Sequence, residues 1–574
     1  IDHRITMAAA QEEVPTWMSN DSDTPPQPPA ETPPIAQDSA PSEEPVQTDA
    51  APPVANEPEP APVIETGPLN PNGMKILIVT IGSRGDVSPA GALAVECMCQ
   101  GAKSVAVATH GAFKSILPEE IEFFDLGVSV DESLYETPDG RAVIEAGGFS
   151  KSSAIKKFAT PILENMIDQL ANAVQTFKPE CIVLFTGAIM IASPVLDRYP
   201  TLSVSWCHLL PYSVTAEHAP PTGYGDGQIY FSMGAQLKWT LNMTARYELY
   251  KPAVDTKRAA WGLPPIETSP LATSDNCLKI MAYSPSLCPR PTDWDQENIH
   301  IVGSLMQKAI QDVGEYKPPL ELNTPLGLGR GATETNPVIF TFGSTLASLT
   351  HAEQTKLLSA AVRVGCDLGV GAIIFTKGAT SDEFGGRNHA LIDDSTRDLI
   401  MADPKVVLFD GEVPHSWLFR RAGAVVCHGG VGTVYTALAC KCPVLVSPVA
   451  EEADHAWWAG CLERQGLGKL VQTARSHKSG KALADTLRSV LPGGTDAQAL
   501  KTRISEFSDS MRATDPAQAA AKLVIDRTQS TAAKVGKNRF ELFPRELIFD
   551  ATGPNASSVT PKHFRLKHEA AVYR

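Results

Sequence analysis

The chain has 574 residues, 46 prolines and a net charge of −16, and both the prolines and the charge are concentrated at one end. Residues 1–73 hold 16 of the prolines and 13 Asp and Glu residues against one basic residue, Arg4, so this segment alone carries −12. It has too little apolar surface to offset chain entropy and is predicted to be a disordered acidic, Pro-rich tail. The other 501 residues carry only −4, which argues against nucleic-acid binding through net positive charge.

Cysteines and apolar runs indicate the compartment. The 11 cysteines form no CxxC pair, as expected of reduced thiols rather than of a zinc site or a disulfide framework. The longest apolar run, 181–196, is interrupted by Gly187, Ser193 and Pro194 and is too broken to span a bilayer. We therefore expect a cytoplasmic protein whose contact with a membrane, if it makes one, is peripheral.

The first ordered element is predicted to begin directly after Met74, where 75–81 is a continuous apolar run of strand length. Such a run is typical of a strand buried on both faces of a parallel sheet. A glycine loop follows, and strand and helix patterns then alternate, with a helix from Pro89, strands at 104–109 and 181–185, and an amphipathic helix around 161–176. This alternation predicts a doubly wound Rossmann-like domain over residues 74–313.

The same pattern starts again in the second half of the chain. Residues 314–336 are rich in Pro, Gly and Thr and are predicted to be an interdomain linker. Further buried strands are expected at 337–342, 372–376, 406–409, 424–427 and 443–446, followed by helices from 479 to 529. We therefore predict an α/β protein with two Rossmann-like domains, 74–313 and 337–529, facing a cleft, and a loosely held tail at 530–574.

The strongest local signal is the segment 425–433, in which a strand ends at His428 and a turn with three glycines opens a helix. Glycines allow backbone N–H groups to approach a ligand closely, and a helix N-terminus favours an anion, so phosphate is one interpretation. The other is a tight turn with a satisfied histidine. The chain has neither a Walker loop nor a GxGxxG fingerprint.

The loop after the first strand, Gly82-Ser83-Arg84-Gly85-Asp86, places one carboxylate at a strand end. Asp86 could act as a general base, which must lie within hydrogen-bond reach of the group that it deprotonates. From spacing alone, however, an Asp in this position is more typical of a helix cap.

Several separated blocks resemble the glycosyltransferase group that includes sterol glucosyltransferases and bacterial aglycone glycosyltransferases. The resemblance covers 74–470. Its motifs are a GxRGDxxP-like loop at 82–89, the block Ala108-Thr109-His110-Gly111, the block Ser284-Pro285-Ser286-Leu287-Cys288-Pro289, Phe342-Gly343-Ser344, Val413-Pro414-His415, and His428-Gly429-Gly430-Val431-Gly432-Thr433. The resemblance implies the two-domain GT-B fold and an inverting, metal-independent transfer of a hexosyl group, with UDP-glucose as the expected donor.

The resemblance also implies roles for individual residues. Asp86 matches the position of the catalytic base, which reverses the preference for a cap. Gly343 and Ser344 would face the diphosphate, Val413 and Pro414 would hold the nucleotide base, and His428 would contact the phosphates together with Gly430, Gly432 and Thr433. Asp454 and His455 resemble the block that binds sugar hydroxyls, although His455 replaces the usual Gln and 449–453 is about two residues longer than usual.

The partners implied are a nucleotide-sugar donor, which is a co-substrate rather than a cofactor, and a sterol or other hydrophobic acceptor. Six ring-bearing residues of the first domain could line an acceptor site, but buried aromatic residues are more often core: Trp206, His208, Tyr212, Phe231, Trp239 and Tyr247. The pair Asp393–Asp394 lies in a polar stretch and is interpreted as solvated rather than as a metal site. Two alternatives stay open: a GT-B nucleotide-sugar epimerase, and a non-catalytic binding protein with a transferase-like fold.

Overall fold

The computed structural model describes residues 73–146, 151–199, 202–221, 234–272, 277–306, 316–320, 322, 336–376, 379, 391–449, 454–471 and 480–535. The predicted acidic tail, most of the predicted linker, the lengthened segment at 450–453 and positions 536–574 lie outside these residues. Both sheets described below belong to one compact unit of the chain.

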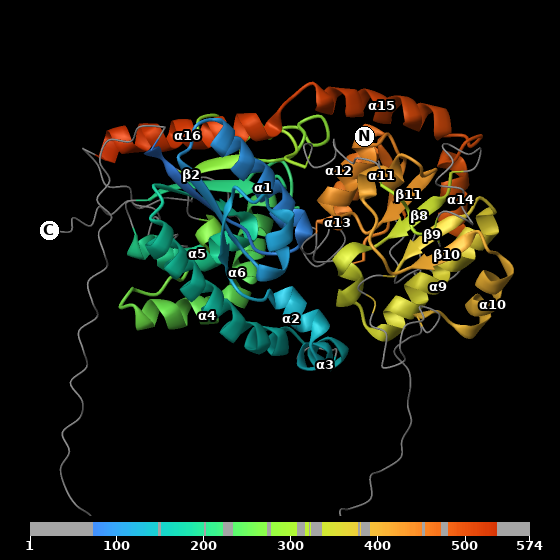
Figure 1. Ribbon diagram of the computed structural model, residues 1–574, viewed down its shortest axis with the longest axis horizontal. Coiled ribbons are helices and arrows are strands. Elements are labelled where there is room, and N and C mark those ends of the chain that lie inside the picture. The colour runs from blue at the N-terminus through green and yellow to red at the C-terminus, as the bar shows by residue number, and fades with distance from the viewer. Residues whose placement is uncertain are drawn as a thin grey trace, which may run out of the picture. The chain divides into compact units, whose positions relative to one another are not determined.

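The first sheet contains seven parallel strands in the described part of the chain, in the order β3-β2-β1-β4-β5-β6-β7. Its strands are β1 (Lys75–Val79), β2 (Ser104–Thr109), β3 (Glu122–Asp125), β4 (Cys181–Phe185), β5 (Ser203–His208), β6 (Leu278–Met281) and β7 (Ile299–Ile301). The helices of this region are α1 (Arg84–Cys99), η2 (Gly111–Ile116), α2 (Val130–Glu136), α3 (Pro138–Ala146), α4 (Lys151–Phe177), α5 (Thr186–Arg198), α6 (Ala235–Ala260) and η3 (Pro270–Ala272). Figure 1 labels β2 of this sheet, together with α1 and α5.

Alternating residues of the inner strands enter two different cores, as a strand buried on both faces requires. In β1, Leu77 and Val79 pack with residues of α4, α5 and α6, whereas Ile76 and Ile78 pack with residues of α1. Helices cover both faces of the sheet, which explains why the sequence after Met74 is continuously apolar. The apolar run at 181–196 is divided into β4 and α5.

The second sheet is also parallel and has the order β10-β9-β8-β11-β12-β13 among the described residues. Its strands are β8 (Val338–Thr341), β9 (Ala372–Phe375), β10 (Val406–Phe409), β11 (Ala424–Cys427), β12 (Val444–Val446) and β13 (Gly468–Leu470). The helices that follow them are η5 (Gly343–Ser348), α9 (His351–Leu368), α10 (Asp394–Ala402), α11 (His415–Phe419), α12 (Val431–Ala439) and α13 (His455–Gln465). The predicted α/β class with two Rossmann-like sheets is confirmed.

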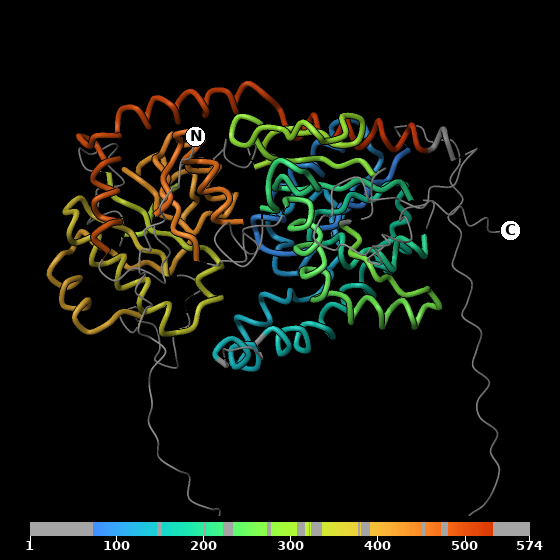
Figure 2. The backbone as a smooth tube through the Cα atoms, turned by 180° about the vertical axis from the view of Figure 1, so that it is seen from behind, coloured from blue at the N-terminus to red at the C-terminus, as the bar shows by residue number. Residues whose placement is uncertain are grey.

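The chain ends its described part with α14 (Lys481–Val490), α15 (Ala497–Arg512) and α16 (Pro516–Val535), shown in red tones in Figures 1 and 2. α15 packs against α12 and α14 of the second sheet's region, but α16 packs against α1, β5 and β6 of the first. Ala517, Ala520 and Val524 are buried in the first region's core. Residues 516–529, which the sequence pattern groups with the second domain, therefore contact the first, and 530–535 continue α16 instead of starting a loose tail.

Strand order determines where a ligand can bind, because open parallel sheets bind ligands beyond the carboxyl ends of the strands where the order reverses. In the first sheet this switch lies between β1 and β4, and in the second between β8 and β11. The loops after these strands include 82–86, the start of η5, and 428–433. Three segments singled out from the sequence therefore lie at switch points.

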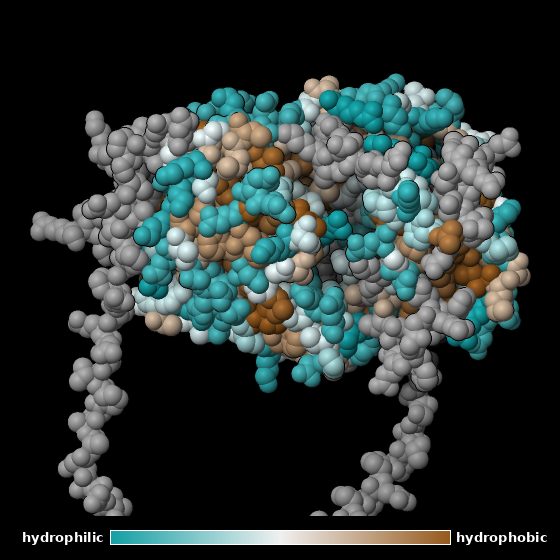
Figure 3. Space-filling view, viewed as in Figure 1, coloured by the Kyte–Doolittle hydropathy of each residue, from teal (hydrophilic) through white to brown (hydrophobic). Residues whose placement is uncertain are grey.

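The described helices include none with the length and apolarity that a membrane span needs. On the face shown in Figure 3, hydrophilic residues (teal) are interspersed with smaller groups of hydrophobic residues (brown). The large hydrophobic side chains that are most exposed come from separate parts of the described chain, apart from Leu399 and Met401, which both lie on α10: Val128, Val214, Leu237, Leu320, Leu399, Met401 and Leu470.

Candidate active site

The loop after β1 is a helix start in which Asp86 has a defined structural place. Ser83 is the N-cap of α1, and its hydroxyl accepts a hydrogen bond from the Gly85 N–H. The Ser83 N–H in turn donates to Oδ2 of Asp86 at 2.8 Å, and the Ser83 hydroxyl donates to the same oxygen at 3.1 Å. Ser83 and Asp86 therefore form a capping box, with Asp86 as its third helical residue rather than as the cap itself.

Gly82 and His110 hold this loop from the other side. Gly82 has a φ of +126°, and a Cβ there would lie 2.5 Å from Oδ2 of Asp86, so only glycine leaves room for the carboxylate. The Gly82 N–H donates to Nε2 of His110 at 3.2 Å, while Nδ1 of His110 lies 3.0 Å from the Gly127 carbonyl oxygen. Both ring nitrogens of His110 are therefore used by the backbone. His110, at the next strand end, positions the loop and is poorly placed to be an alternative base.

The environment of Asp86 favours a neutral carboxyl group. Burial raises the pKa of Asp86 to about 6, against the opposing effect of the two hydrogen bonds from Ser83. The nearby charges of Asp454 and Asp131 raise the pKa further. A pKa close to the operating pH is the property that a general base needs, because the group must be ionised yet able to take a proton. Asp86 is therefore both a capping-box residue and a carboxylate with a base-like pKa.

The loop after β11 is built around the imidazole of His428. A Cβ at Gly343 would lie 3.0 Å from Cε1 of His428, and one at Gly430 would overlap Nε2. Gly343 also has a φ of +55°. Close approach of a ligand is therefore not the only explanation for glycine at these two positions. The His428 ring also occupies the space in which a side chain would lie.

His428 is buried, and within the described ranges its Nδ1 has no hydrogen-bond partner. Burial has the largest effect on the pKa of His428 and His455 the next largest, and together they lower it to about 3 against the opposing effect of the nearby Thr341 backbone, so the ring is neutral at pH 7. A buried polar atom without a partner is costly and is expected to mark a place for a ligand or a water molecule. Gly430 is the N-cap of α12, so Gly432 and Thr433 lie in the helix's first turn, where N–H groups have no partner within the helix.

Asp454 and His455 approach this loop from the start of α13. The rings of His428 and His455 meet edge to face at a centroid distance of 4.8 Å. Asp454 accepts a hydrogen bond from Nε1 of Trp458 at 2.7 Å, and burial raises its pKa. The structure therefore brings Asp454 into the electrostatic neighbourhood of Asp86, although the two residues come from different sheets' regions.

Val413 and Pro414 lie where α11 begins, with Pro414 as its N-cap and Val413 buried. The next residue, His415, stacks on Phe419 at 4.8 Å, and its charge is close enough to affect the pKa of His428. Arg84, from the first loop, lies 3.9 Å from Glu412 as an exposed ion pair. These contacts place 412–415 next to both strand-end loops.

Other residues noted in the sequence are structural. Five ring-bearing residues of the first domain are almost completely buried core: Trp206, His208, Tyr212, Trp239 and Tyr247, while Phe231 lies outside the described residues. Asp393 is the N-cap of α10, accepts a hydrogen bond from the Thr396 N–H and pairs with Arg363. Asp393 thus organises a helix start instead of lying in a loop, whereas its side chain is 39% exposed and that of Asp394 is 92% exposed, in agreement with the interpretation of the pair as solvated.

Sequence reasoning missed two contributors to the site. Ser83 was part of the first motif, but its role as cap and hydrogen-bond donor to Asp86 was not predicted. The spacing Ser83-x-x-Asp86 resembles a capping box and could have indicated it. Asp131, whose charge raises the pKa of Asp86, follows the N-cap Ser129 of α2. A helix start could be predicted there, but its closeness to Asp86 depends on the tertiary fold.

Comparison with known proteins places the chain in a class. No protein-family model matches it. It is 25% identical over 461 residues to the vancomycin aglycone glucosyltransferase of Amycolatopsis orientalis, covering 79% of this chain and 97% of that protein. It is 27% identical over 431 residues to a sterol 3-beta-glucosyltransferase of Cryptococcus neoformans, covering 72% of this chain but only 25% of that protein.

A solved structure with the same fold is Medicago truncatula UGT71G1, complexed with UDP-glucose. It has a TM-score of 0.54 at 12% identity and covers 80% of this chain and 99% of its own. The two parallel sheets show the GT-B fold, and the relatives indicate a nucleotide-sugar glycosyltransferase of the GT-B type that is similar to glycosyltransferases of the family 1 type. Its homologues include both sterol 3-beta-glucosyltransferases and antibiotic glycosyltransferases, at about 25% identity.

Proposed function

We propose that this enzyme transfers glucose from UDP-glucose, with inversion, to a hydroxyl group of a sterol or another lipophilic acceptor. The observation that carries the proposal is the pairing of two sites at strand switch points. One holds a carboxylate, Asp86, with a pKa of about 6, and the other holds a buried histidine, His428, at a helix N-terminus. The first suits proton abstraction and the second suits a diphosphate.

In the proposed donor site, the diphosphate lies against the α12 N-terminus, with Gly430, Gly432 and Thr433 supplying backbone N–H groups. Neutral His428 donates one hydrogen bond to a phosphate oxygen, and Gly343 and Ser344 border the same ligand. Val413 and Pro414 contact the nucleotide base, and Asp454 and His455 contact the sugar hydroxyls. We expect the reaction not to need a metal, because the helix N-terminus and the hydrogen-bond donors stabilise the charge on the leaving diphosphate.

In the proposed reaction, the acceptor hydroxyl oxygen attacks the anomeric carbon while its proton passes to Asp86. The bond between the anomeric carbon and the diphosphate oxygen breaks, and the electron pair leaves with UDP. Both hydrogen bonds from Ser83 go to Oδ2 of Asp86, so Oδ1 is the oxygen proposed to accept the proton. Holding the base through one oxygen leaves the other aligned for the substrate.

Support for the acceptor comes from the relatives alone. Proteins named sterol 3-beta-glucosyltransferase recur among them, from Cryptococcus neoformans and Arabidopsis thaliana, beside enzymes named for antibiotic acceptors. These names share the transfer of a sugar to an acceptor, and the sterol names among them are the ones that favour a lipophilic acceptor.

The test is a panel of UDP- and TDP-sugars against sterols, other lipids and polyketide aglycones, with products identified by mass spectrometry. Glycosylated sterol with UDP-glucose, a β-linkage by NMR and insensitivity to EDTA are expected. A preference for a TDP-sugar or for a non-lipid acceptor would overturn the finer assignment. Incubation with donor alone separates an epimerase from a transferase, because only the epimerase would change the donor sugar without an acceptor. A binding protein is distinguished by the absence of a glycosylated product with every acceptor of the panel.

A further inference from the structure

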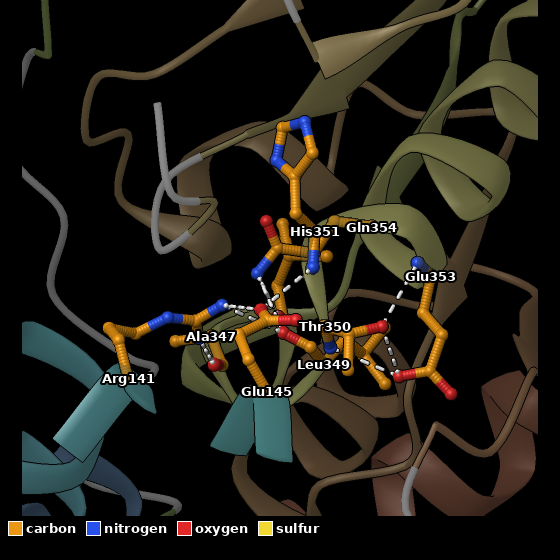
Figure 4. Close-up of polar contacts among 9 residues, drawn as sticks. Arg141, Glu145, Ala347, Leu349, Thr350, His351, Glu353 and Gln354 are labelled. Carbon is orange, nitrogen blue, oxygen red and sulfur yellow. Dashed lines mark hydrogen bonds and ion pairs between the residues drawn. The ribbon is translucent and has the colours of Figure 1, made fainter. Parts of the chain in front are cut away.

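A polar contact joins α3 of the first sheet's region to η5, which begins at Gly343 and Ser344 (Figure 4). We call Gly343 and Ser344, which are proposed to border the diphosphate, the donor loop. Arg141, from α3, donates from Nη1 to the Ala347 carbonyl oxygen at 2.6 Å and from Nη2 to the Leu349 carbonyl oxygen at 3.3 Å. Glu145, one turn further along α3, accepts from Nη2 of Arg141 at 2.8 Å and from the His351 N–H at 3.1 Å. We call Arg141 and Glu145 the α3 pair.

The α3 pair is chemically matched to what it contacts. Carbonyl oxygens at the end of a helical turn carry partial negative charge, which suits the guanidinium group of Arg141. His351 is the first residue of α9, where the N–H groups favour a carboxylate such as that of Glu145. The Arg141 side chain is only 16% exposed, so these contacts are less screened than an ordinary surface ion pair.

The segment held by Arg141 is the one that begins at the donor loop. η5 starts at Gly343, against the ring of His428, and its last residues lie at the α3 pair. Between these ends, Gln354 donates from Nε2 to the carbonyl oxygens of Leu346 and Leu349, at 3.0 and 3.2 Å. A shift of the far end of η5 is therefore transmitted to Gly343 and Ser344 through a short, well-bonded segment.

The other side of the α3 pair leads toward the proposed base. α3 packs against α2, and α2 carries Asp131, whose charge raises the pKa of Asp86. Arg141 and Glu145 thus connect an element next to the base with an element next to the donor. Transfer requires the base, the acceptor and the anomeric carbon to be aligned, and a displacement of about 1 Å can lower the rate about a hundredfold.

We propose that Arg141, supported by Glu145, is a positioning residue that sets the donor loop against the first sheet's region for transfer. The proposal rests on the proposed function. Arg141 does not touch the substrates; it acts through η5. A purely structural role would instead make the second sheet's region less stable. The bonds from Gln354 hold η5 from within its own region, so that region is expected to fold without Arg141.

The experiment compares Arg141→Ala, Arg141→Lys and Arg141→Ala/Glu145→Ala with wild type in the full chain. The control is Arg488→Ala, which removes an arginine paired with Asp367 and Asp485 on the outside of the second region. For Arg141→Ala we expect kcat to fall about tenfold while the Kd for UDP, measured by calorimetry, changes less than twofold. Arg141→Lys recovers part of the rate, because it keeps the charge but not the two-carbonyl geometry. The double variant is no slower than Arg141→Ala, because both changes break one contact.

Two outcomes would overturn the proposal. One is an Arg141→Ala rate within twofold of wild type. The other is a loss of UDP affinity and Tm that matches the loss of rate, which would show a structural role. Hydrogen–deuterium exchange provides a readout that does not need activity: UDP should slow exchange in 138–145 of wild type but not of Arg141→Ala. If wild type binds no UDP, the proposed function fails; if it binds UDP but exchange in 138–145 is unaffected, only the role of Arg141 fails.

Discussion

The loops after β1 and β11 both place a polar side chain at a strand end, but they differ in whether their polar groups have hydrogen-bond partners within the protein. In the loop after β1, the polar groups satisfy one another: Ser83 holds Asp86, and His110 holds Gly82. In the loop after β11, His428 is buried with an Nδ1 that has no partner in the described ranges. The difference teaches that a reacting group must be oriented before the substrate arrives, whereas a binding group is left for the ligand to satisfy.

The largest expected effect is the loss of turnover when Asp86, the group oriented by Ser83, is replaced. Asp86→Asn keeps an oxygen for the Ser83 N–H but cannot take a proton, so turnover should fall by at least about 100-fold, the lower limit for a general base. UDP affinity should stay close to wild type and the Tm should not fall, because the capping box survives. Steady-state rates at saturating acceptor, calorimetry and thermal melting provide the measurements. A near-normal rate would reduce Asp86 to a helix-capping residue and remove half of the comparison.

A smaller effect, on UDP affinity, is expected when His428 is replaced. His428→Ala removes one hydrogen bond to a charged oxygen, worth about 1.5–3 kcal/mol, so UDP should bind about 10- to 100-fold more weakly. The matched control is His208→Ala, a second buried histidine with an unpartnered nitrogen, but in the first region. That variant should melt earlier and bind UDP normally. Equal UDP affinity in His428→Ala and wild type would show that the ring only packs between the glycines.

The pH profile should separate the loops further. Since Asp86 must be ionised to act and its pKa is about 6, kcat/KM should fall about tenfold per pH unit below that value. His428, with a pKa lowered to about 3, should contribute no limb between pH 5 and 8. An acid limb near pH 4, the ordinary range of an aspartate, would show that burial does not tune this carboxyl group.

The raised pKa of Asp86 also makes the stability of the protein depend on pH. The contribution of Asp86 to the folding free energy is fully present below its unfolded pKa, near 3.8, and is lost as pH rises through about 6, because the charged form is the one that burial penalises. Asp86→Asn lacks this loss. The Tm of the variant relative to wild type should therefore increase between pH 4 and pH 7, and a constant difference would contradict the assignment.

The smallest effect is expected at the support of the first loop. His110→Ala removes the acceptor for the Gly82 N–H and the contact with the Gly127 carbonyl oxygen, at a cost of about 1–3 kcal/mol of stability. We expect a lower Tm and a few-fold lower rate, with the acid limb of the pH profile unchanged. A lost acid limb would instead assign the proton transfer to His110 and not to Asp86.

Much of the fold could be predicted from the sequence, because buried strands have short apolar runs that are recognisable locally. The runs at 104–109, 181–185, 406–409 and 424–427 became strands with the predicted bounds, since strands buried on both faces need continuous apolar sequence. Five strands whose short sequences include polar residues or glycine were not predicted: β3, β5, β6, β7 and β13. The site motifs were found for the same reason: glycines and a polar residue at a strand end are local signals.

The sequence by itself determined the two Rossmann-like halves, the position of Asp86 and His428 at strand ends, and the unusual His455. Only the tertiary structure decided that α16 returns to the first sheet, that Asp454 and Asp131 act on Asp86, and that Arg141 contacts Ala347. The physical reason is the sequence separation over which each effect acts. Periodicity and capping act over a few residues, whereas the pKa of Asp86 and the contact at Arg141 depend on groups up to several hundred residues away, which only the packed chain brings together.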